Sequence, residues 1–226
     1  MIAVICARSG SKRIKNKNIV NFFGKPIIYY PIKIAKNSNL IQKIYVSTDS
    51  KKIKKIVEKY GAEVPYLRKK SLSNDNAPLK KALEDFCQNI NIEENYVCCI
   101  YSTAVLLNSE LINKAFLKIK RLKYDLILGV KEFETDPNLA MYIKDKKINF
   151  LNKKYYLSNK KRKKYYLDAG YFFIFNKKNF FKKEYLPKKT TYFVLNNDEA
   201  LDINYQKDLE LLKILFNKKH KNYFIR

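Results

Sequence analysis

Short apolar runs alternate with stretches of helical periodicity along most of the chain. The apolar runs predict strands at residues 1–7, 43–48, 63–67, 96–101, 124–130, 171–175 and 192–195. Apolar residues three and four positions apart predict helices over about 26–37, 53–60, 79–89, 111–122 and 205–216. Repeated strand–helix units with right-handed crossovers predict a mostly parallel α/β sheet that is covered on both faces.

Two boundaries and one interruption complete this pattern. Asn108 or Ser109 is expected to cap the helix that follows, and Gly61 to end an earlier helix. From about residue 135 to residue 165 the pattern breaks into β-like pieces, AMYIKD and KINFL, around charged turns. We therefore expect one domain over 1–226, with a small β insertion or dimerisation arm at about 135–165.

Polar loops follow three of the predicted strands, at residues 8–17, 48–50 and 102–103. In parallel sheets, ligands bind beyond the carboxyl ends of the strands. The first loop contains Gly10 and several cations, and its amides and side chains suit a polyphosphate. An ordinary basic surface loop is the alternative, and the convergence of three polar loops favours a ligand site.

Composition narrows the class of protein. The chain has 226 residues, of which 46% are hydrophobic, enough for a sizeable core. No apolar stretch is long enough to span a bilayer, and the first residues lack the features of a signal peptide. We expect a cytoplasmic protein without a membrane partner.

Cysteine and histidine usage excludes several chemistries. Cys6, Cys87, Cys98 and Cys99 form no CxxC pair and are expected to be free thiols. The single histidine, His220, lies in a basic tail. A histidine base in the core, and with it Ser-His-Asp chemistry, is therefore not expected.

The formal charge of +26 raises the question of nucleic-acid binding. The excess is almost all lysine spread along the chain, whereas arginine is preferred for bidentate phosphate and base contacts. We expect general attraction to polyanions but no specific nucleic-acid partner.

Six short motifs follow one another along the chain. They are ICARSGSKRIKNKNI (5–19), VSTDS (46–50), EVPYLRKKSLSND (63–75), CCIYSTA (98–104), DAGYFF (168–173) and LDINYQKDLE (201–210). In this order they resemble the signatures of the CMP-sialate synthetases, the acylneuraminate cytidylyltransferase family. The resemblance covers nearly the whole chain and implies a three-layer, Rossmann-like nucleotidyltransferase fold.

Within this group, three segments are most similar to pseudaminic acid cytidylyltransferases. They are YGAEVPYLR (60–68), CCIYSTA, and the YxDAGxF arrangement that begins at Tyr166. CMP-Kdo synthetases usually carry a KPL-type sequence where this chain has Lys17-Asn18-Ile19, so they are the second choice.

The resemblance implies that a sugar hydroxyl attacks the α-phosphate of CTP, forming a CMP-sugar and releasing pyrophosphate. Such a reaction depends on positioning and fixed positive charge. Arg8 and Lys17 are the implied catalytic residues, with Lys17 at the α-phosphate. The implied nucleotide-binding residues are Ala7, Arg8, Ser9, Gly10, Ser11, Lys12, Lys17, Asn18 and Arg68, with Asn18 and Arg68 at the cytosine and ribose.

A divalent metal, most simply Mg²⁺, would bridge phosphate oxygens. The family places two aspartates at alternate positions, and here they are Asp202 and Asn204. The asparagine still offers a neutral oxygen but lowers the charge of the site. Asp208 is expected to start a helix rather than to replace the missing ligand.

The sugar side departs further from the family. Tyr101, Thr103, Tyr166 and Asp168 are the implied sugar-binding residues, with core packing or turn formation as the alternative role. The family's arginine segment before DAG is replaced by LSNKK (157–161), so either a lysine binds the sugar carboxylate or this contact is lost. Gln, common after DAG, is Tyr171, and the proline usual after the fourth motif is Val105.

Three hypotheses therefore stand. The first is a Mg²⁺-dependent, homodimeric cytidylyltransferase acting on CTP and an acidic nine-carbon sugar, most simply pseudaminic acid. The second is a relative that binds the nucleotide but has impaired catalysis. The third is a polyanion-binding protein driven by charge.

Overall fold

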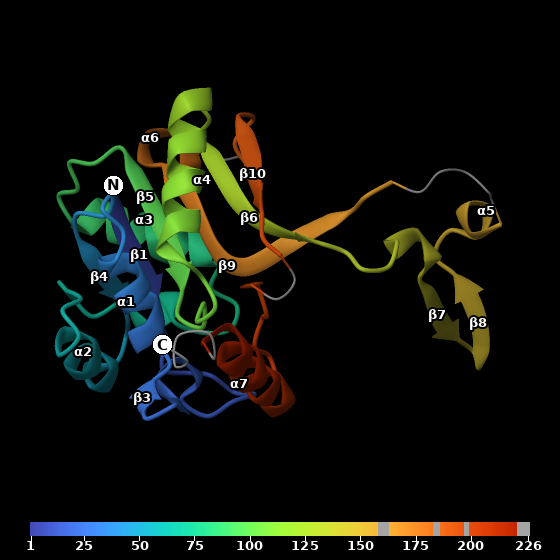
Figure 1. Ribbon diagram of the computed structural model, residues 1–226, viewed down its shortest axis with the longest axis horizontal. Helices are drawn as coiled ribbons and strands as arrows, with labels where there is room; N and C mark the ends of the chain where they lie inside the picture. The colour runs from blue at the N-terminus through green and yellow to red at the C-terminus, as the bar shows by residue number, and fades with distance from the viewer. Residues whose placement is uncertain (158–162, 183–185, 197–198, 221–226) are drawn as a thin grey trace.

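The computed structural model describes residues 1–157, 163–182, 186–196 and 199–220 (Figure 1). Its centre is a six-stranded sheet in the order β10-β6-β9-β5-β1-β4. The strands are β1 (Ile2–Cys6), β4 (Ile44–Ser47), β5 (Tyr96–Tyr101), β6 (Leu126–Glu132), β9 (Tyr166–Asn176) and β10 (Thr190–Val194). Neighbouring strands are parallel except at β9, which runs antiparallel to both β5 and β6. The predicted mostly parallel α/β sheet is confirmed.

Two hydrophobic clusters, one on each face of the sheet, make up the core. Alternate residues of β1 separate between them: Ala3 and Ile5 join one cluster, and Ile2 and Val4 the other. The first cluster includes side chains from α1 (Tyr29–Lys36), α2 (Lys51–Glu58), α4 (Ser109–Leu122) and α7 (Gln206–His220), and the second includes side chains from α3 (Leu79–Asn89) and α6 (Lys177–Phe180). Helices therefore cover both faces of the sheet, which confirms the predicted three layers. The central strand β1 is apolar throughout because it is buried on both faces.

Local signals set the helix boundaries. Asn108 caps α4, since its side chain accepts a hydrogen bond from the amide of Glu110 at 2.8 Å, as predicted. Ser50 caps α2 by accepting from the amide of Ile53. Gly61 follows the end of α2 with a φ of +78°, a conformation that glycine adopts without strain.

The strand predicted at 63–67 is wrong. Only two isolated bridges form there, Tyr45 with Glu63 and Thr48 with Leu67. Pro65 lies between them, and because proline has no amide hydrogen it cannot continue a hydrogen-bonded ladder. The helix predicted from residue 26 begins instead at Tyr29, after a short hairpin of β2 (Asn21–Phe22) and β3 (Lys25–Pro26).

The segment predicted as a β insertion extends away from the main sheet (Figure 1). It contains the 3₁₀ helix η3 (Pro137–Leu139), the hairpin of β7 (Met141–Lys144) and β8 (Lys147–Phe150), and the short helix α5 (Lys153–Tyr156). The hairpin turns at Asp145 and Lys146, which both have positive φ. We call residues 136–157 the arm.

The predicted free thiols are confirmed for all four cysteines, two of which are buried. No helix in the described ranges is long and apolar enough to cross a membrane.

Candidate active site

A cavity of about 640 Å³ opens at the carboxyl ends of β1 and β5. Ten residues that the sequence analysis assigned to a site line it: Arg8, Ser11, Lys12, Lys17, Asn18, Arg68, Tyr101, Thr103, Asp202 and Asn204. They come from both ends of the chain and from its middle. The sheet therefore brings most of the predicted residues together, and their individual roles stay predictions.

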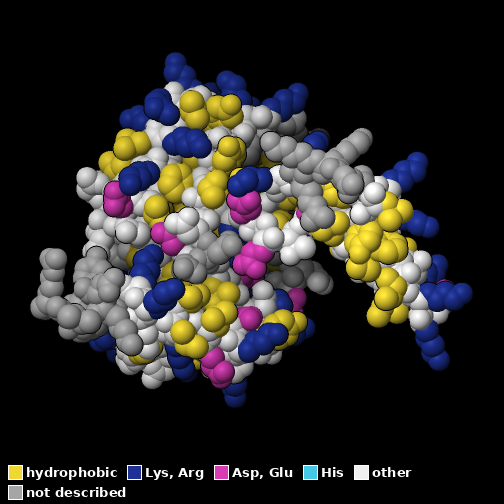
Figure 2. All heavy atoms as spheres, turned by 45° about the vertical axis from the view of Figure 1, so that its right-hand side comes forward, with side chains coloured by type: hydrophobic (Ala, Val, Ile, Leu, Met, Phe, Trp, Pro, Cys, Tyr) yellow, Lys and Arg dark blue, Asp and Glu magenta, His cyan; other side chains and the backbone are white. Residues whose placement is uncertain are grey.

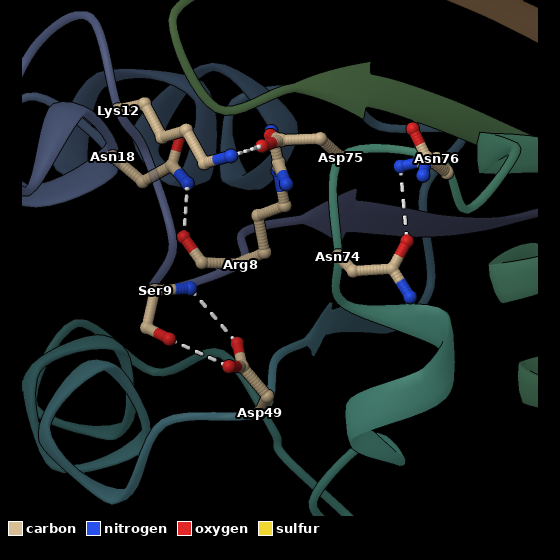
Figure 3. A network of polar contacts seen from close by, with 8 residues as sticks. All are labelled: Arg8, Ser9, Lys12, Asn18, Asp49, Asn74, Asp75 and Asn76. Atoms are coloured by element: carbon tan, nitrogen blue, oxygen red, sulfur yellow. Dashed lines mark hydrogen bonds and ion pairs between the residues drawn. The ribbon is translucent and has the colours of Figure 1, made fainter.

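Ser9 lies outside the lining of this cavity and contacts the loop after β4. Its amide and hydroxyl both donate to the carboxylate of Asp49, at 2.8 and 2.6 Å (Figure 3). These bonds join the loop after β1 to the loop after β4. The structure thus gives Ser9 a structural contact, while Ala7 and Gly10 also lie outside the lining.

Asn18 joins two further loops. It lies in the 3₁₀ helix η1 (Lys17–Ile19) and is 7% exposed. Its Nδ2 donates to the main-chain oxygen of Arg8 at 2.7 Å, and its Oδ1 accepts from the hydroxyl of Ser102 at 2.6 Å. Both ends of the amide therefore hold the cavity wall in shape.

Arg68 is buried in the wall of the cavity that lies next to the second hydrophobic cluster. Its amide donates to the oxygen of Thr48, and its Nε donates to the hydroxyl of Ser73 at 3.0 Å. The pKa of Cys6 is lowered by hydrogen bonding to Cys99 and, to a lesser degree, by the charge of Arg68. A fixed guanidinium and two thiols thus form this wall.

Lys17 links the first motif to the last. Its ammonium group donates to the main-chain oxygen of Ile203, beside Asp202. Burial lowers the pKa of Lys17, and the negative charge of Asp202 partly offsets that effect. The side chain therefore places a positive charge between the cationic loop after β1 (residues 8–17) and the carboxylate of Asp202.

Asp202 and Asn204 lie next to each other, as their alternate spacing predicts. The Nδ2 of Asn204 donates to Oδ2 of Asp202 at 2.7 Å. Gly170 packs against the same carboxylate: a Cβ at Gly170, where φ is +64°, would lie 3.7 Å from Cγ of Asp202. A contact at that distance is ordinary, and the positive φ is what explains the glycine of the DAG motif.

Asp208 acts at the start of α7. Its Oδ2 accepts from the amides of Asn204 and Tyr205, at 2.8 and 2.7 Å. The expectation that it begins a helix is confirmed. Among the described residues, no group of three or more His, Cys, Asp or Glu side chains is arranged to hold a metal.

The predicted sugar-binding residues separate into two pairs. Tyr101 and Thr103 line the cavity, and burial raises the pKa of Tyr101. Tyr166 and Asp168 do not line it: Tyr166 stacks on Tyr192, and Asp168 accepts from the amide of Gly170 at 2.8 Å. The lysines at 160 and 161, considered for the sugar carboxylate, lie outside the described residues.

Two charged residues of the cavity were missing from the predicted site. Asp75 contacts Arg8 Nη2 at 2.5 Å and Lys12 Nζ at 2.8 Å (Figure 3). Arg13 also lines the cavity, with its guanidinium over the ring of Tyr205. Asp75 ends the third motif and Arg13 lies in the first, so their positions in these motifs were the available signal.

The sheet, the helices on both of its faces and the cavity at the carboxyl ends of its strands define a Rossmann-like α/β fold. CMP:2-keto-3-deoxy-manno-octonic acid synthetase, solved in complex with CTP, superposes with a TM-score of 0.73 over 96% of this chain and 98% of its own, at 14% identity. 4-Diphosphocytidyl-2C-methyl-D-erythritol synthase from Anaerococcus prevotii gives a TM-score of 0.63 over 94% and 93% of the two chains, also at 14% identity. At this identity the likeness concerns the fold.

Sequence comparison specifies the family. The cytidylyltransferase family model matches residues 2–226, and the chain belongs to that family. It is 34% identical to pseudaminic acid cytidylyltransferase of Campylobacter jejuni over 99% of both chains. N-acylneuraminate cytidylyltransferase of Streptococcus agalactiae is 33% identical over 64% of this chain and 35% of its own length. The predicted family and the predicted class of enzyme, a nucleotidyltransferase, are confirmed.

Proposed function

We propose that this enzyme transfers CMP from CTP to a nonulosonic acid, and that the acid is pseudaminic acid. The full-length similarity to pseudaminic acid cytidylyltransferases supports this sugar over the alternatives. The observation that carries the proposal is the position of Lys17. Its ammonium group extends from the cationic loop that contains Arg8 and Lys12 to the LDIN segment. The phosphate-binding cations and the proposed metal ligands therefore lie in one cavity.

The proposed reaction uses these charges directly. The anomeric hydroxyl oxygen of the sugar bonds to the α-phosphorus, the bond from that phosphorus to the β-phosphate oxygen breaks, and pyrophosphate leaves with its electrons. The hydroxyl proton is lost to solvent. Lys17 faces the α-phosphate and Arg8 and Lys12 face the leaving phosphates, so positive charge lies where negative charge develops.

The residues present fit a magnesium ion. Asp202 supplies a carboxylate and Asn204 a neutral oxygen, and Mg²⁺ is commonly held by one or two protein ligands together with phosphate oxygens. When bound, the ion would neutralise charge on the phosphates. The amide of Asn204 donates to the carboxylate of Asp202, and this hydrogen bond holds the two side chains next to each other.

Tyr101 and Thr103 are the proposed sugar contacts within the cavity, with Tyr166 and Asp168 farther along β9.

A second copy of the chain is proposed to cover the arm. Apolar side chains gather on the arm (Figure 2), and Ile143, Ile148 and Leu151 are 79%, 68% and 63% exposed. An apolar surface of this kind favours a protein interface.

The nucleotide-binding relative with impaired catalysis remains the second candidate, and Asn204 is the observation that favours it. Turnover separates the two. Purified protein is incubated with CTP, Mg²⁺ and one of four acids: pseudaminic, legionaminic, N-acetylneuraminic or Kdo. We expect pyrophosphate release with pseudaminic acid above all. Tight CTP binding with no product from any acid would instead support the impaired relative.

A further inference from the structure

Two cations of the loop after β1, Arg8 and Lys12, already pair with a carboxylate of the protein itself. Asp75 contacts Nη2 of Arg8 through Oδ1 and the ammonium of Lys12 through Oδ2, at 2.5 and 2.8 Å (Figure 3). One carboxylate thus bridges both cations, each oxygen taking one of them. Two phosphate oxygens would make the same pair of contacts.

The segment that carries Asp75 is braced from the protein side. Ser73, two residues earlier, accepts from the buried Arg68 and donates to the oxygen of Lys69. Asn74 accepts from the amide of Asn76 at 2.9 Å and donates to the oxygen of Ser71. Asp75 therefore projects from an ordered turn toward the cavity, where its carboxylate remains 38% exposed.

Lys17 stands apart from this arrangement. Its ammonium is bonded to Ile203, on the side of the cavity formed by the LDIN motif. Of the three cations proposed to face the phosphates, Lys17 therefore lies at the α-phosphate position, and Arg8 and Lys12 are bridged by Asp75. Only a ligand with further phosphates has anionic groups for both Lys17 and this pair.

We propose that Asp75 is an internal ligand of the β- and γ-phosphate subsite, which a polyphosphate must displace, so that Asp75 weakens polyphosphate binding there and leaves the binding of a nucleoside monophosphate unchanged. The inference rests on the proposed function, because that function places CTP in the cavity. A pyrophosphate group carries more charge than one carboxylate and displaces it. The single phosphate of CMP lies at Lys17 and leaves the Asp75 contacts intact.

This arrangement also affects product release. After transfer, pyrophosphate is held by Arg8 and Lys12, and its departure would leave two unpaired cations. Asp75 returns to them and offsets that cost, so the protein binds pyrophosphate more weakly than it would with an empty cationic pair. Exposed ion pairs are individually weak, and two of them correspond to roughly a three- to tenfold change in an equilibrium constant.

A competing explanation gives Asp75 the opposite effect. If the carboxylate only orients Arg8 and Lys12 for the phosphates, its removal loosens both cations and weakens binding. Removal of an internal competitor instead strengthens binding. The direction of the change in pyrophosphate affinity separates the two.

The test is calorimetric titration of the full chain with pyrophosphate and, separately, with CMP. EDTA is present so that no metal bridges the carboxylate to a phosphate, and ionic strength is held constant. The variants are Asp75→Asn and, as a control of equal charge change, Glu58→Gln, which removes an exposed acid paired with Lys54 at the far end of α2. Circular dichroism confirms the fold, and Asp75→Ala replaces Asp75→Asn if that variant loses secondary structure.

We expect Asp75→Asn to bind pyrophosphate roughly three- to tenfold more tightly than wild type, with CMP affinity within about twofold and Glu58→Gln unchanged. Weaker or unchanged pyrophosphate binding by Asp75→Asn would overturn the inference. Equal tightening for CMP, or for Glu58→Gln, would also overturn it, because either result reports general charge. The titration needs neither sugar nor turnover, so failure of the proposed reaction alone would leave this result standing.

Discussion

The hydroxyl of Ser102 donates to Oδ1 of Asn18 at 2.6 Å, and both side chains are buried. This bond connects the loop after β5 to the loop after β1, 84 residues apart. The Nδ2 of Asn18 completes the connection at the oxygen of Arg8. The cavity wall thus depends on an amide that donates at one end and accepts at the other.

Replacing Asn18 by Asp should therefore disrupt this wall. The carboxylate would still accept from Ser102 but would face the oxygen of Arg8 without a hydrogen to donate. We expect a loss of about 1–3 kcal/mol in the free energy of unfolding, measured by urea denaturation, together with weaker CTP binding. Ser102→Ala should cost less, since it leaves the Arg8 contact intact. Equal stability of Asn18→Asp and wild type would contradict this role.

Lys17→Ala should nearly abolish turnover while the fold survives. The ammonium group donates to Ile203 and is half-buried, so its loss removes a positive charge from the α-phosphate position. We expect kcat to fall by about 10²- to 10³-fold, in the range for one stabilising donor, with little change in the thermal midpoint. Lys207→Ala, an exposed lysine of α7, is the control. Wild-type kcat in Lys17→Ala would contradict the assignment.

The rate should also fall at alkaline pH because of Lys17. Burial lowers its pKa, so the positive charge is present below that pKa and is lost as pH rises through it. The alkaline fall in kcat/KM, which reports the free enzyme, should therefore begin below the pH at which an ordinary lysine titrates. The same depressed pKa means that the unfolded chain binds more protons in this window, so this group makes stability rise with pH there.

Lys17→Arg provides the check on that pH profile. An arginine stays protonated throughout the range, so any residual activity of this variant should lack the alkaline fall. A fall at the same pH in Lys17→Arg and in wild type would show that a different group titrates.

Asn204→Asp should strengthen metal binding. The present amide donates to Asp202 at 2.7 Å, whereas a second carboxylate would repel it and add negative charge. We expect tighter binding of Mn²⁺, measured directly by electron paramagnetic resonance, and lower stability of the metal-free protein. Asn149→Asp, on the arm, supplies a control of equal charge change. Unchanged Mn²⁺ affinity in Asn204→Asp would remove these two residues from the proposed metal site.

The arm offers a test of the proposed dimer. Ile143 and Ile148 are directly opposite each other in the β7–β8 hairpin and share one face. Replacing both by Lys should yield monomers in light scattering, because two charges cannot be buried at an apolar interface without cost. Asn149→Lys, on the other face, should leave the assembly unchanged. A double variant with the same mass as wild type would exclude this face as the interface.

The sequence predicted the sheet well because its signal is local. β5 was delimited to the residue, and Asn108 marked the start of α4. Pro65 was overlooked within an apolar run, and it prevented the strand expected at 63–67. The antiparallel direction of β9 was not predictable from periodicity, because a buried strand reads the same in either direction.

The candidate site was predictable in membership more than in contacts. The motifs placed Arg8, Lys17 and Asp202 in one cavity, as the structure does. The bond from Ser9 to Asp49 and the bridge from Asp75 to Lys12 depend on which way a loop side chain turns. Packing between distant loops decides that direction, and no local sequence pattern encodes it.

The central claim is that this cavity transfers CMP to pseudaminic acid. The most direct measurement incubates the protein with CTP, Mg²⁺ and pseudaminic acid, and quantifies CMP-sugar by mass spectrometry alongside pyrophosphate. We predict that both form in equal amounts, that neither forms when CTP or sugar is omitted, and that Lys17→Ala forms almost none. Binding of CTP without any CMP-sugar, or pyrophosphate release that does not need the sugar, would contradict the account.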